Sequence, residues 1–373
     1  MSAVSSVSAP SAASAAHAAE LRVALLGFGK GGSVFHAPLI DATPGLRLSG
    51  VVTGDSARAA AVGHRYPQAT VHPSAEHLWE RATDYDIAVV TTPNDSHVPL
   101  AHAALKSGLA VVVDKPLALD VAEARDLVAT AAQREQVLTV YHNRRWDADF
   151  QTLWHLVDSG ELGRVHRFES RFERWRPEAR DSWRDSGPAA AGGGILWDLG
   201  PHLVDQAVNL FGPVARVYAE LDACRPGVSA EDDAFLALTH RDGTRSHLWA
   251  SAVAAQRGPR FRVLGDRAAF TIHGMDSQED RLNQGERPDR PDWGEVLQQH
   301  WGELGADGTV RKVPSVRGNY PAFYAGLRDA VAEGEPVPVE PHEVVHGLDV
   351  IDAARRSAAA GTAAAVPEPT PLH

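Results

Sequence analysis

The feature that most constrains the fold is an alternation of short apolar runs with helix-compatible segments between Leu21 and His142. The apolar runs are rich in β-branched residues and almost continuously hydrophobic, as strands buried on both faces of a parallel sheet are. Five such runs occur, namely LRVALLG, LRLSGVV, YDIAVVTT, LAVVVDKP and QVLTVYH. Strands that alternate with helices in this way predict a doubly wound α/β domain.

The pattern changes after His142. A helix is predicted over residues 146–163, and several segments between residues 165 and 266 then alternate apolar and polar residues. Period-two alternation in consecutive segments predicts an antiparallel sheet with one covered face. The Pro-, Gly- and charge-rich residues 275–316 are expected to be mostly loop. Two helices are expected to close the chain, the first beginning at the sequence YPAF and the second at HEVV.

The length of 373 residues is large for a single core and favours two domains. We place an α/β domain at residues 21–142 and an α+β domain at residues 143–363. Residues 1–20 are almost entirely Ala and Ser, with no Lys, Arg, Leu, Ile or Phe, so they lack the features of a secretory signal and predict a disordered tail. Residues 364–373 are expected to form a C-terminal tail.

The composition excludes several classes of partner. The formal net charge of −12 disfavours binding to nucleic acid or to anionic lipid. Since no run of about 18 apolar residues occurs, no membrane span is expected, and we expect a cytoplasmic protein. The single cysteine, Cys224, excludes an intramolecular disulfide and a Cys-based zinc site, and no metal is expected.

A glycine-rich turn directly follows the first predicted strand. The sequence GFGKGG places Gly27, Gly29 and Gly32 at the spacing G-x-G-x-x-G between a strand and a helix. Gly27 permits the tight turn, Gly29 lets the backbone approach a pyrophosphate, and Gly32 allows close packing of the helix on the strand. The helix N-terminus then faces the negative charge of the phosphates. In this context the motif predicts dinucleotide binding.

The end of the second predicted strand indicates which dinucleotide is bound. NAD enzymes usually place an acid there for the ribose 2′-hydroxyl, whereas NADP enzymes replace the acid and add an Arg. Thr53 takes the strand end and Arg58 lies in the first turns of the next helix, for which Asp55 is the expected N-cap. The pattern favours NADP over NAD, and the alternative is that Arg58 is only a solvated surface residue.

Polar residues also follow two later strands, in the sequences TTPNDSH and DKP. Open α/β sheets bind ligands at the carboxyl ends of their parallel strands. We therefore assign to the coenzyme site Thr92, Pro93, Asn94, His97 and Lys115. Turn formation and helix capping are the alternative roles for Asn94 and His97. Lys115 emerges directly from a buried strand, which an ordinary surface Lys rarely does.

The sequence HNRRWD lies at the junction of the two predicted domains. Its Asn and two Arg residues can bind a polar substrate or tie the domains together. We interpret Arg145 as structural and keep Asn143 as a candidate substrate residue. The later cluster RFERWRPEARDSWR suits a sugar-like ligand, but a solvated sheet face accounts for most of it.

The segment GGGILWDLGPHLVDQ holds an Asp and a His four residues apart. On a helix, such side chains share one face and lie about 6 Å apart along the axis. Taken alone, Asp198 is well placed as a helix N-cap, with His202 incidental. A coenzyme domain and a strand-end Lys upstream favour the other interpretation, in which the helix presents an acid and a base to a substrate.

In their order along the chain these motifs resemble the Gfo/Idh/MocA family, the relatives of glucose–fructose oxidoreductase and inositol dehydrogenase. The resemblance rests on the glycine-rich turn, TPNDSH, DKP, HNRRWD, GGGILWDLGPHLVDQ and GNYPAFYAGLRDA, and runs from about Leu21 to the C-terminal helices. The VVDKP, HNRRWD and DLGPHLVDQ blocks look most like the scyllo-inositol dehydrogenase branch. Asp114 departs from the Glu that many relatives have before Lys-Pro, which should matter little because the Lys carries the chemistry.

The resemblance implies an N-terminal Rossmann domain and a C-terminal α+β domain with an open, mostly antiparallel sheet used in oligomerisation. The family's catalytic Lys, Asp and His fall on Lys115, Asp198 and His202, which we also expect to contact the substrate. We expect His202 to be the general acid/base, Asp198 to orient it, and Lys115 to hold the reacting hydroxyl.

The expected protein is a homodimer or homotetramer that transfers hydride between a sugar or cyclitol CH–OH carbon and NADP or NAD. Two alternatives remain, namely a carbonyl reductase of the same family and a non-enzymatic NAD(P)-binding sensor or co-regulator.

Overall fold

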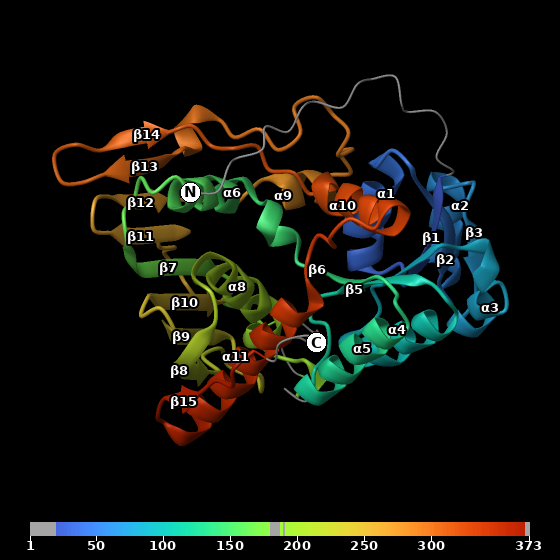
Figure 1. Ribbon diagram of the computed structural model, residues 1–373, viewed down its shortest axis with the longest axis horizontal. Coiled ribbons are helices and arrows are strands. Elements are labelled where there is room, and N and C mark those ends of the chain that lie inside the picture. The colour runs from blue at the N-terminus through green and yellow to red at the C-terminus, as the bar shows by residue number, and fades with distance from the viewer. Residues whose placement is uncertain (1–19, 180–186, 189–190, 370–373) are drawn as a thin grey trace.

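The N-terminal domain is a twisted parallel sheet covered by helices (Figure 1). The computed structural model describes residues 20–179, 187–188 and 191–369. The strands are β1 (Leu21–Leu26), β2 (Leu46–Val52), β3 (Thr70–His72), β4 (Ile87–Val90), β5 (Ala110–Asp114) and β6 (Leu138–Tyr141). Their order, β3-β2-β1-β4-β5-β6, is that of a Rossmann fold, and every pair is parallel.

Short helical segments connect these strands. They are η1 (Gly31–His36), α1 (Ala37–Ala42), α2 (Ser56–Arg65), α3 (Ala75–Trp79), η2 (Ala82–Asp84), η3 (Asn94–Ser96), α4 (His97–Lys106) and α5 (Val121–Gln133). The central strand β4 and the edge strand β6 are buried at every residue, as continuous apolar runs in a doubly covered sheet should be. Because the order reverses beside β1, the carboxyl ends of β1 and β4 open a crevice at the sheet edge.

The C-terminal domain is an open sheet of nine strands with helices on one face (Figure 1). The strands are β7 (Val165–Glu173), β8 (Val214–Asp222), β9 (Asp233–His240), β10 (Arg245–Ser251), β11 (Phe261–Gly265), β12 (Ala269–Ile272), β13 (Gly302–Gly305), β14 (Arg311–Val313) and β15 (Ala364–Ala365). The order is β14-β13-β12-β11-β7-β10-β9-β8-β15, antiparallel except for the parallel pair β7 and β10. The predicted fold class is therefore confirmed.

The remaining helices are η4 (Asn143–Trp146), α6 (Ala148–Asp158), α8 (Ile195–Phe211), α9 (Gln278–Asn283), η6 (Gln298–His300), α10 (Pro321–Glu333) and α11 (Pro341–Ala360). Helices α8 and α11 pack on one face of the sheet. Burial alternates at every residue of β9, which is the period-two pattern expected of a strand with one covered face. The half-buried residues Phe235, His247 and Trp249 lie on the opposite face.

The last two helices join the domains. Helix α10 packs on α1, while α11 contacts both α5 and α8. Arg125 of α5 donates from Nη2 to both carboxylate oxygens of Asp349, each at 2.8 Å, and the Thr139 hydroxyl donates to the Val339 carbonyl at 2.8 Å. A chain segment assigned to the second domain from sequence therefore also supports the first.

The structure corrects two local expectations and adds detail to a third. The three-residue strand β3 was not among the predicted runs, because it is too short to show a pattern. Residues 275–316 are not merely loop, since they form α9 and add β13 and β14 to the sheet. Ala364 and Ala365, placed in the C-terminal tail, pair with β8 as β15. The predicted N-terminal tail lies outside the described residues except for Glu20.

Candidate active site

One cavity of about 730 Å³ runs between the two domains. Its walls include the glycine-rich turn, the carboxyl ends of four parallel strands, and residues from β7, α8 and α9. A cavity of this size, at the point where the strand order reverses, is where an open α/β sheet binds its ligand. All but one of the predicted site residues line it; the exception is Gly32.

The glycine-rich turn has the geometry of a phosphate-binding loop. Gly27 has φ +100°, a conformation that favours glycine, and the Thr91 hydroxyl donates to its carbonyl at 2.9 Å. A Cβ atom on Gly32 would lie 2.1 Å from the Gly27 carbonyl oxygen, so only glycine allows this close packing. A Cβ atom on Gly29 would meet nothing within 4 Å, which leaves its backbone open to the cavity. The turn at Gly27 and the close packing at Gly32 agree with the steric roles expected from sequence, and the approach of a pyrophosphate to Gly29 stays a prediction.

The end of β2 supplies the residues expected near the adenosine ribose. Thr53 and Arg58 both line the cavity. Asp55 is the N-cap of α2, as predicted, because its Oδ1 accepts from the Arg58 backbone N–H at 2.8 Å. The Arg58 side chain is exposed, and within the described part of the chain its guanidinium has no ion-pair partner.

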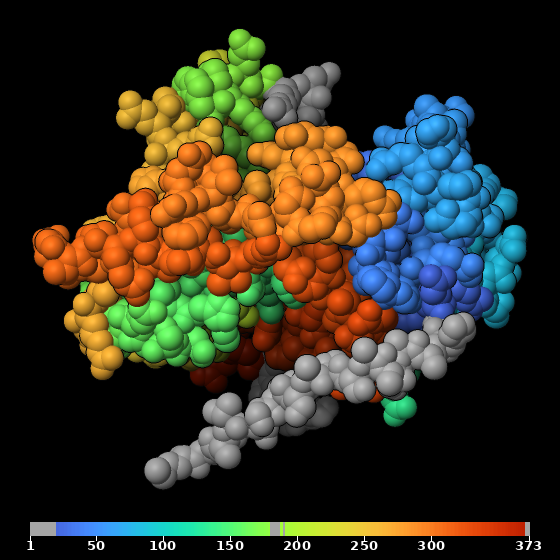
Figure 2. All heavy atoms as spheres, turned by 90° about the horizontal axis from the view of Figure 1, so that it is seen from above, coloured from blue at the N-terminus to red at the C-terminus, as the bar shows by residue number. Residues whose placement is uncertain are grey.

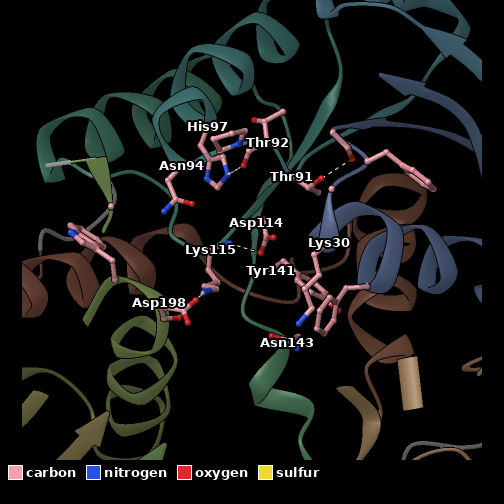
Figure 3. Close-up of a pocket in the computed structure, with 18 of the residues that line it drawn as sticks. Lys30, Thr91, Thr92, Asn94, His97, Asp114, Lys115, Tyr141, Asn143 and Asp198 are labelled. Carbon is pink, nitrogen blue, oxygen red and sulfur yellow. Dashed lines mark hydrogen bonds and ion pairs between the residues drawn. The ribbon is translucent and has the colours of Figure 1, made fainter. Parts of the chain in front are cut away.

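Residues after β4 form the wall above Lys115 (Figure 3). His97 is buried, and its two ring nitrogens lie 2.8 Å from the Pro116 carbonyl and 2.9 Å from the Thr92 carbonyl. His97 thus links two strand ends. Asn94 approaches the C-terminal domain, since a Cβ on Gly192 would lie 2.7 Å from its Nδ2.

Lys115 reaches from the end of β5 to helix α8. Its Nζ donates to the Asp198 carbonyl at 2.7 Å and lies 3.7 Å from Asp198 Oδ1 (Figure 3). The Lys115–Pro116 peptide is cis. Asp114 accepts from the Lys115 backbone N–H at 2.8 Å. The strand-end Lys and the helix acid, 83 residues apart in the chain, therefore meet at the domain boundary.

Asp198 and His202 lie in the first two turns of α8 and both line the cavity. The N-cap is Gly194, so the alternative in which Asp198 caps the helix is wrong. Within the described ranges no hydrogen bond or ion pair joins Asp198 to His202. The Asp198 carboxylate lies instead near Lys115 and within 4.0 Å of Arg174 Nη1.

His202 occupies a buried and electropositive position. Its side chain is 6% exposed, and its Nδ1 has no hydrogen-bond partner among the described residues. Burial lowers the pKa of His202 well below its ordinary value of 6.5, and Lys115 and Arg144 lower it further. The imidazole is therefore neutral at pH 7, which leaves it able to accept a proton.

The junction residues have separate roles. Arg145 pairs with Asp205 at 2.7 Å and with Glu343 at 2.8 Å, in agreement with a structural role. Asn143 lines the cavity. Arg144 also lines it and is buried, with Asp147, Tyr320 and Glu279 as partners of its guanidinium.

Sequence reasoning missed several residues of the cavity wall. They are Lys30, Phe172, Arg174, Arg176, Trp197 and Glu279. Arg174 and Arg176 belong to the cluster interpreted mostly as a solvated sheet face; alternation along the extension of β7 could have placed them on the side of the buried Phe172. Residues 180–184 of that cluster lie outside the described residues.

Two negative observations apply to the described residues. In that part of the chain no helix is long and apolar enough to cross a membrane. Over the same residues, His, Cys, Asp and Glu side chains form no group of three or more that could hold a metal ion.

Comparisons with known proteins agree with this architecture. Residues 21–142 match the NAD-binding Rossmann fold of an oxidoreductase family, and residues 155–366 match the C-terminal α/β domain of the same family. The chain is 41% identical to the uncharacterised oxidoreductase YdgJ of Escherichia coli (strain K12), over 91% of this chain and 96% of YdgJ. It is 32% identical to the scyllo-inositol 2-dehydrogenase (NADP(+)) IolW of Bacillus subtilis (strain 168), over 90% and 93% of the two chains.

Solved structures show the same two-domain arrangement. The Bacillus subtilis protein yvaA, assigned as an oxidoreductase, has a TM-score of 0.88 and 30% identity, covering 93% of this chain and 99% of yvaA. The YPO2259 protein of Yersinia pestis has a TM-score of 0.87 and 38% identity, covering 95% and 99%. Both family domains are present in order, and the glycine-rich turn has the geometry of a phosphate-binding loop. The chain belongs to the Gfo/Idh/MocA family of oxidoreductases.

Proposed function

We propose that the protein is an NADP(H)-preferring dehydrogenase that acts on a CH–OH group of a sugar or cyclitol. The observation that carries this proposal is the convergence of Lys115, Asp198 and His202, from two domains, on the cavity that contains the glycine-rich turn. A protein that only sensed a dinucleotide would not need a neutral buried base and an ammonium side by side at the far end of the same cavity.

The cavity fits a dinucleotide. The open backbone at Gly29 and the N-terminus of η1 would hold the pyrophosphate. Thr53 and Arg58 would hold the adenosine ribose, and Asn94 and Lys115 line the other end. When bound, the coenzyme supplies the hydride acceptor or donor.

Proton transfer falls to the chain's own residues. Oxidation of an alcohol requires a base that takes the hydroxyl proton as hydride leaves the carbon, and neutral His202 is suited to this. The Lys115 ammonium has three N–H donors, of which one is used by the Asp198 carbonyl. Another can donate to the reacting oxygen and stabilise the negative charge that develops there.

We infer that Asp198 positions Lys115 and does not orient His202. Its Oδ1 lies 3.7 Å from Lys115 Nζ, and among the described residues no hydrogen bond or ion pair joins it to His202. An anion beside Lys115 orients the ammonium and offsets part of its charge. Asp198 therefore positions the group that holds the hydroxyl.

Preference for NADP rests on the end of β2. Thr53 offers no carboxylate for a ribose 2′-hydroxyl, while the exposed Arg58 guanidinium can pair with a 2′-phosphate. The relative IolW is an NADP(+) enzyme by name, which supports the same choice.

The substrate class rests on the relative and on the wall residues. IolW is a scyllo-inositol dehydrogenase, and Asn143 and Trp197 give this cavity a hydrogen-bonding amide and an aromatic surface. We therefore favour a neutral polyhydroxylated ring over a phosphorylated sugar.

A substrate panel tests the proposal. Inositols, free sugars and sugar phosphates would each be offered with NADP and with NAD, and nicotinamide absorbance would be followed at 340 nm. Turnover of a neutral polyol with NADP is expected. Turnover of sugar phosphates alone would refute the substrate class, and coenzyme binding without turnover of any alcohol or carbonyl compound would favour a sensor.

A further inference from the structure

The C-terminal domain reaches over the glycine-rich turn through one short segment. Helix α9 contacts η1, and the orange atoms of this part of the chain lie against the blue N-terminal domain in Figure 2. At this contact Glu279 Oε1 lies 3.7 Å from Nζ of Lys30, the residue between Gly29 and Gly31. Both side chains line the cavity, and Lys30 extends from the turn toward Asn143 in Figure 3.

The buried Arg144 anchors the carboxylate of Glu279. Its Oε2 accepts from Arg144 Nη2. Arg144 is itself buried, donates to Asp147 and to the Tyr320 hydroxyl, and lies 5.2 Å above the Phe172 ring. Because Arg144 is buried and has several partners, it anchors the Glu279 carboxylate, which faces the largely exposed Lys30, whose side chain is 66% exposed.

The charge of Glu279 is unexpected at this position. Burial alone would raise the pKa of its carboxyl, but Arg144, Lys30 and Arg174 hold that pKa below its ordinary value, so the group is ionised at pH 7. It therefore places a negative charge beside the turn that would hold a pyrophosphate. Repulsion between the Glu279 carboxylate and the pyrophosphate would by itself weaken coenzyme binding. If Glu279 favours binding, it must therefore do so through a contact whose effect is larger than this repulsion.

We propose that Glu279 is a coenzyme-positioning residue, which acts through Lys30 to fix the glycine-rich turn against the C-terminal domain and so slows release of the dinucleotide. The inference rests on the coenzyme site of the proposed function and is independent of the substrate class. The ion pair crosses the domain boundary beside the turn, and separation of the domains breaks it.

A second ion pair provides a matched control. Arg287, four residues after α9, donates to Asp41 of α1 at 3.1 Å. This pair also joins the segment to the N-terminal domain, but neither residue lines the cavity. If Glu279 only helped the domains to dock, loss of the Asp41–Arg287 pair would have the same effect.

The test is the release rate of NADPH, measured by stopped-flow fluorescence as excess NADP⁺ displaces it. Single Glu279→Gln and Lys30→Met variants, the double variant and Asp41→Asn would be compared, with circular dichroism to check folding. Exposed ion pairs contribute modestly, so we expect Glu279→Gln to release NADPH about two- to fivefold faster. In the Lys30→Met background the same substitution should give no further acceleration.

Electrostatics alone predicts the opposite sign, because removal of a negative charge beside a bound polyanion slows its release. Equal or slower release from Glu279→Gln would therefore overturn the proposal, and so would equal acceleration in Asp41→Asn. If Glu279→Gln does not fold, Glu279→Asp replaces it, because this variant keeps the negative charge but shortens the reach to Lys30. Faster release of NADPH from Glu279→Asp supports the contact, and unchanged release refutes it. A parent protein that binds NADPH but oxidises no polyol would contradict the proposed substrate without affecting this result.

Discussion

Replacement of His202 by Asn is the most direct test of the catalytic assignment. Loss of a general base typically slows turnover by about 10²–10⁴. Burial, Lys115 and Arg144 lower the pKa of His202, so its proton affinity is modest and the loss should lie nearer the lower end, at about 10²–10³. Because His202 Nδ1 has no hydrogen-bond partner among the described residues, the substitution breaks no bond at that atom.

The assay is steady-state NADPH formation with the best polyol of the substrate panel, together with NADPH binding by fluorescence. Binding should survive, since the Gly27–Gly32 turn is untouched. His142 is the matched control, because it is buried, its ring centre lies 6.1 Å from that of His202, and it does not line the cavity. His142→Asn should therefore retain most of the turnover that His202→Asn loses.

The pH dependence of turnover is a second test, and the assignment of His202 predicts its direction. Oxidation needs neutral His202, so kcat/KM for oxidation should fall as pH drops through a pKa below 6.5. Carbonyl reduction needs the protonated imidazole and should rise over the same range. Turnover of His202→Asn within threefold of the parent, or an acid limb that survives the substitution, would refute the assignment.

Two further predictions concern the coenzyme. Arg58→Ala should weaken NADP binding at least about tenfold and NAD binding little, because the guanidinium can make charge-assisted bonds only to the 2′-phosphate; equal losses for both coenzymes in titrations would contradict the NADP assignment. Gly32→Ala should lower the melting temperature, because its Cβ would lie 2.1 Å from the Gly27 carbonyl oxygen. Gly29→Ala should melt normally yet bind NADPH more weakly, since its Cβ has open space in the folded chain; normal binding would show that the backbone at Gly29 does not approach the coenzyme.

The coenzyme half of the cavity could be predicted because its signals are local. A buried strand, three glycines and a helix start lie within a few residues, and Gly27 and Gly32 each meet a steric demand within the turn or at the neighbouring strand. Lys115 was recognisable because charge directly after a buried strand is rare. In each case the physical cause lies in the backbone near the residue itself.

The residues that the C-terminal domain adds to the cavity wall could not be predicted in this way. Glu279 lies in a six-residue helix just before the charged residues Asp280 and Arg281, and nothing nearby in sequence indicates that it faces a cavity. Its position depends on Arg144, which is 135 residues away and is itself held by Tyr320. Contacts of this kind are set by how the two domains pack, which periodicity does not encode.

The spacing of Asp198 and His202 in sequence suggests that the acid orients the base, but the charges around Asp198 indicate a different role. The separation of four residues on α8 does place Asp198 and His202 on the same cavity, but the carboxylate turns toward Lys115 and Arg174. After burial, Lys115 is the largest cause of the lowered pKa of His202. An anion that neutralises part of the Lys115 charge must then weaken this effect and raise the proton affinity of His202. We infer that Asp198 tunes the base through Lys115, without touching the imidazole.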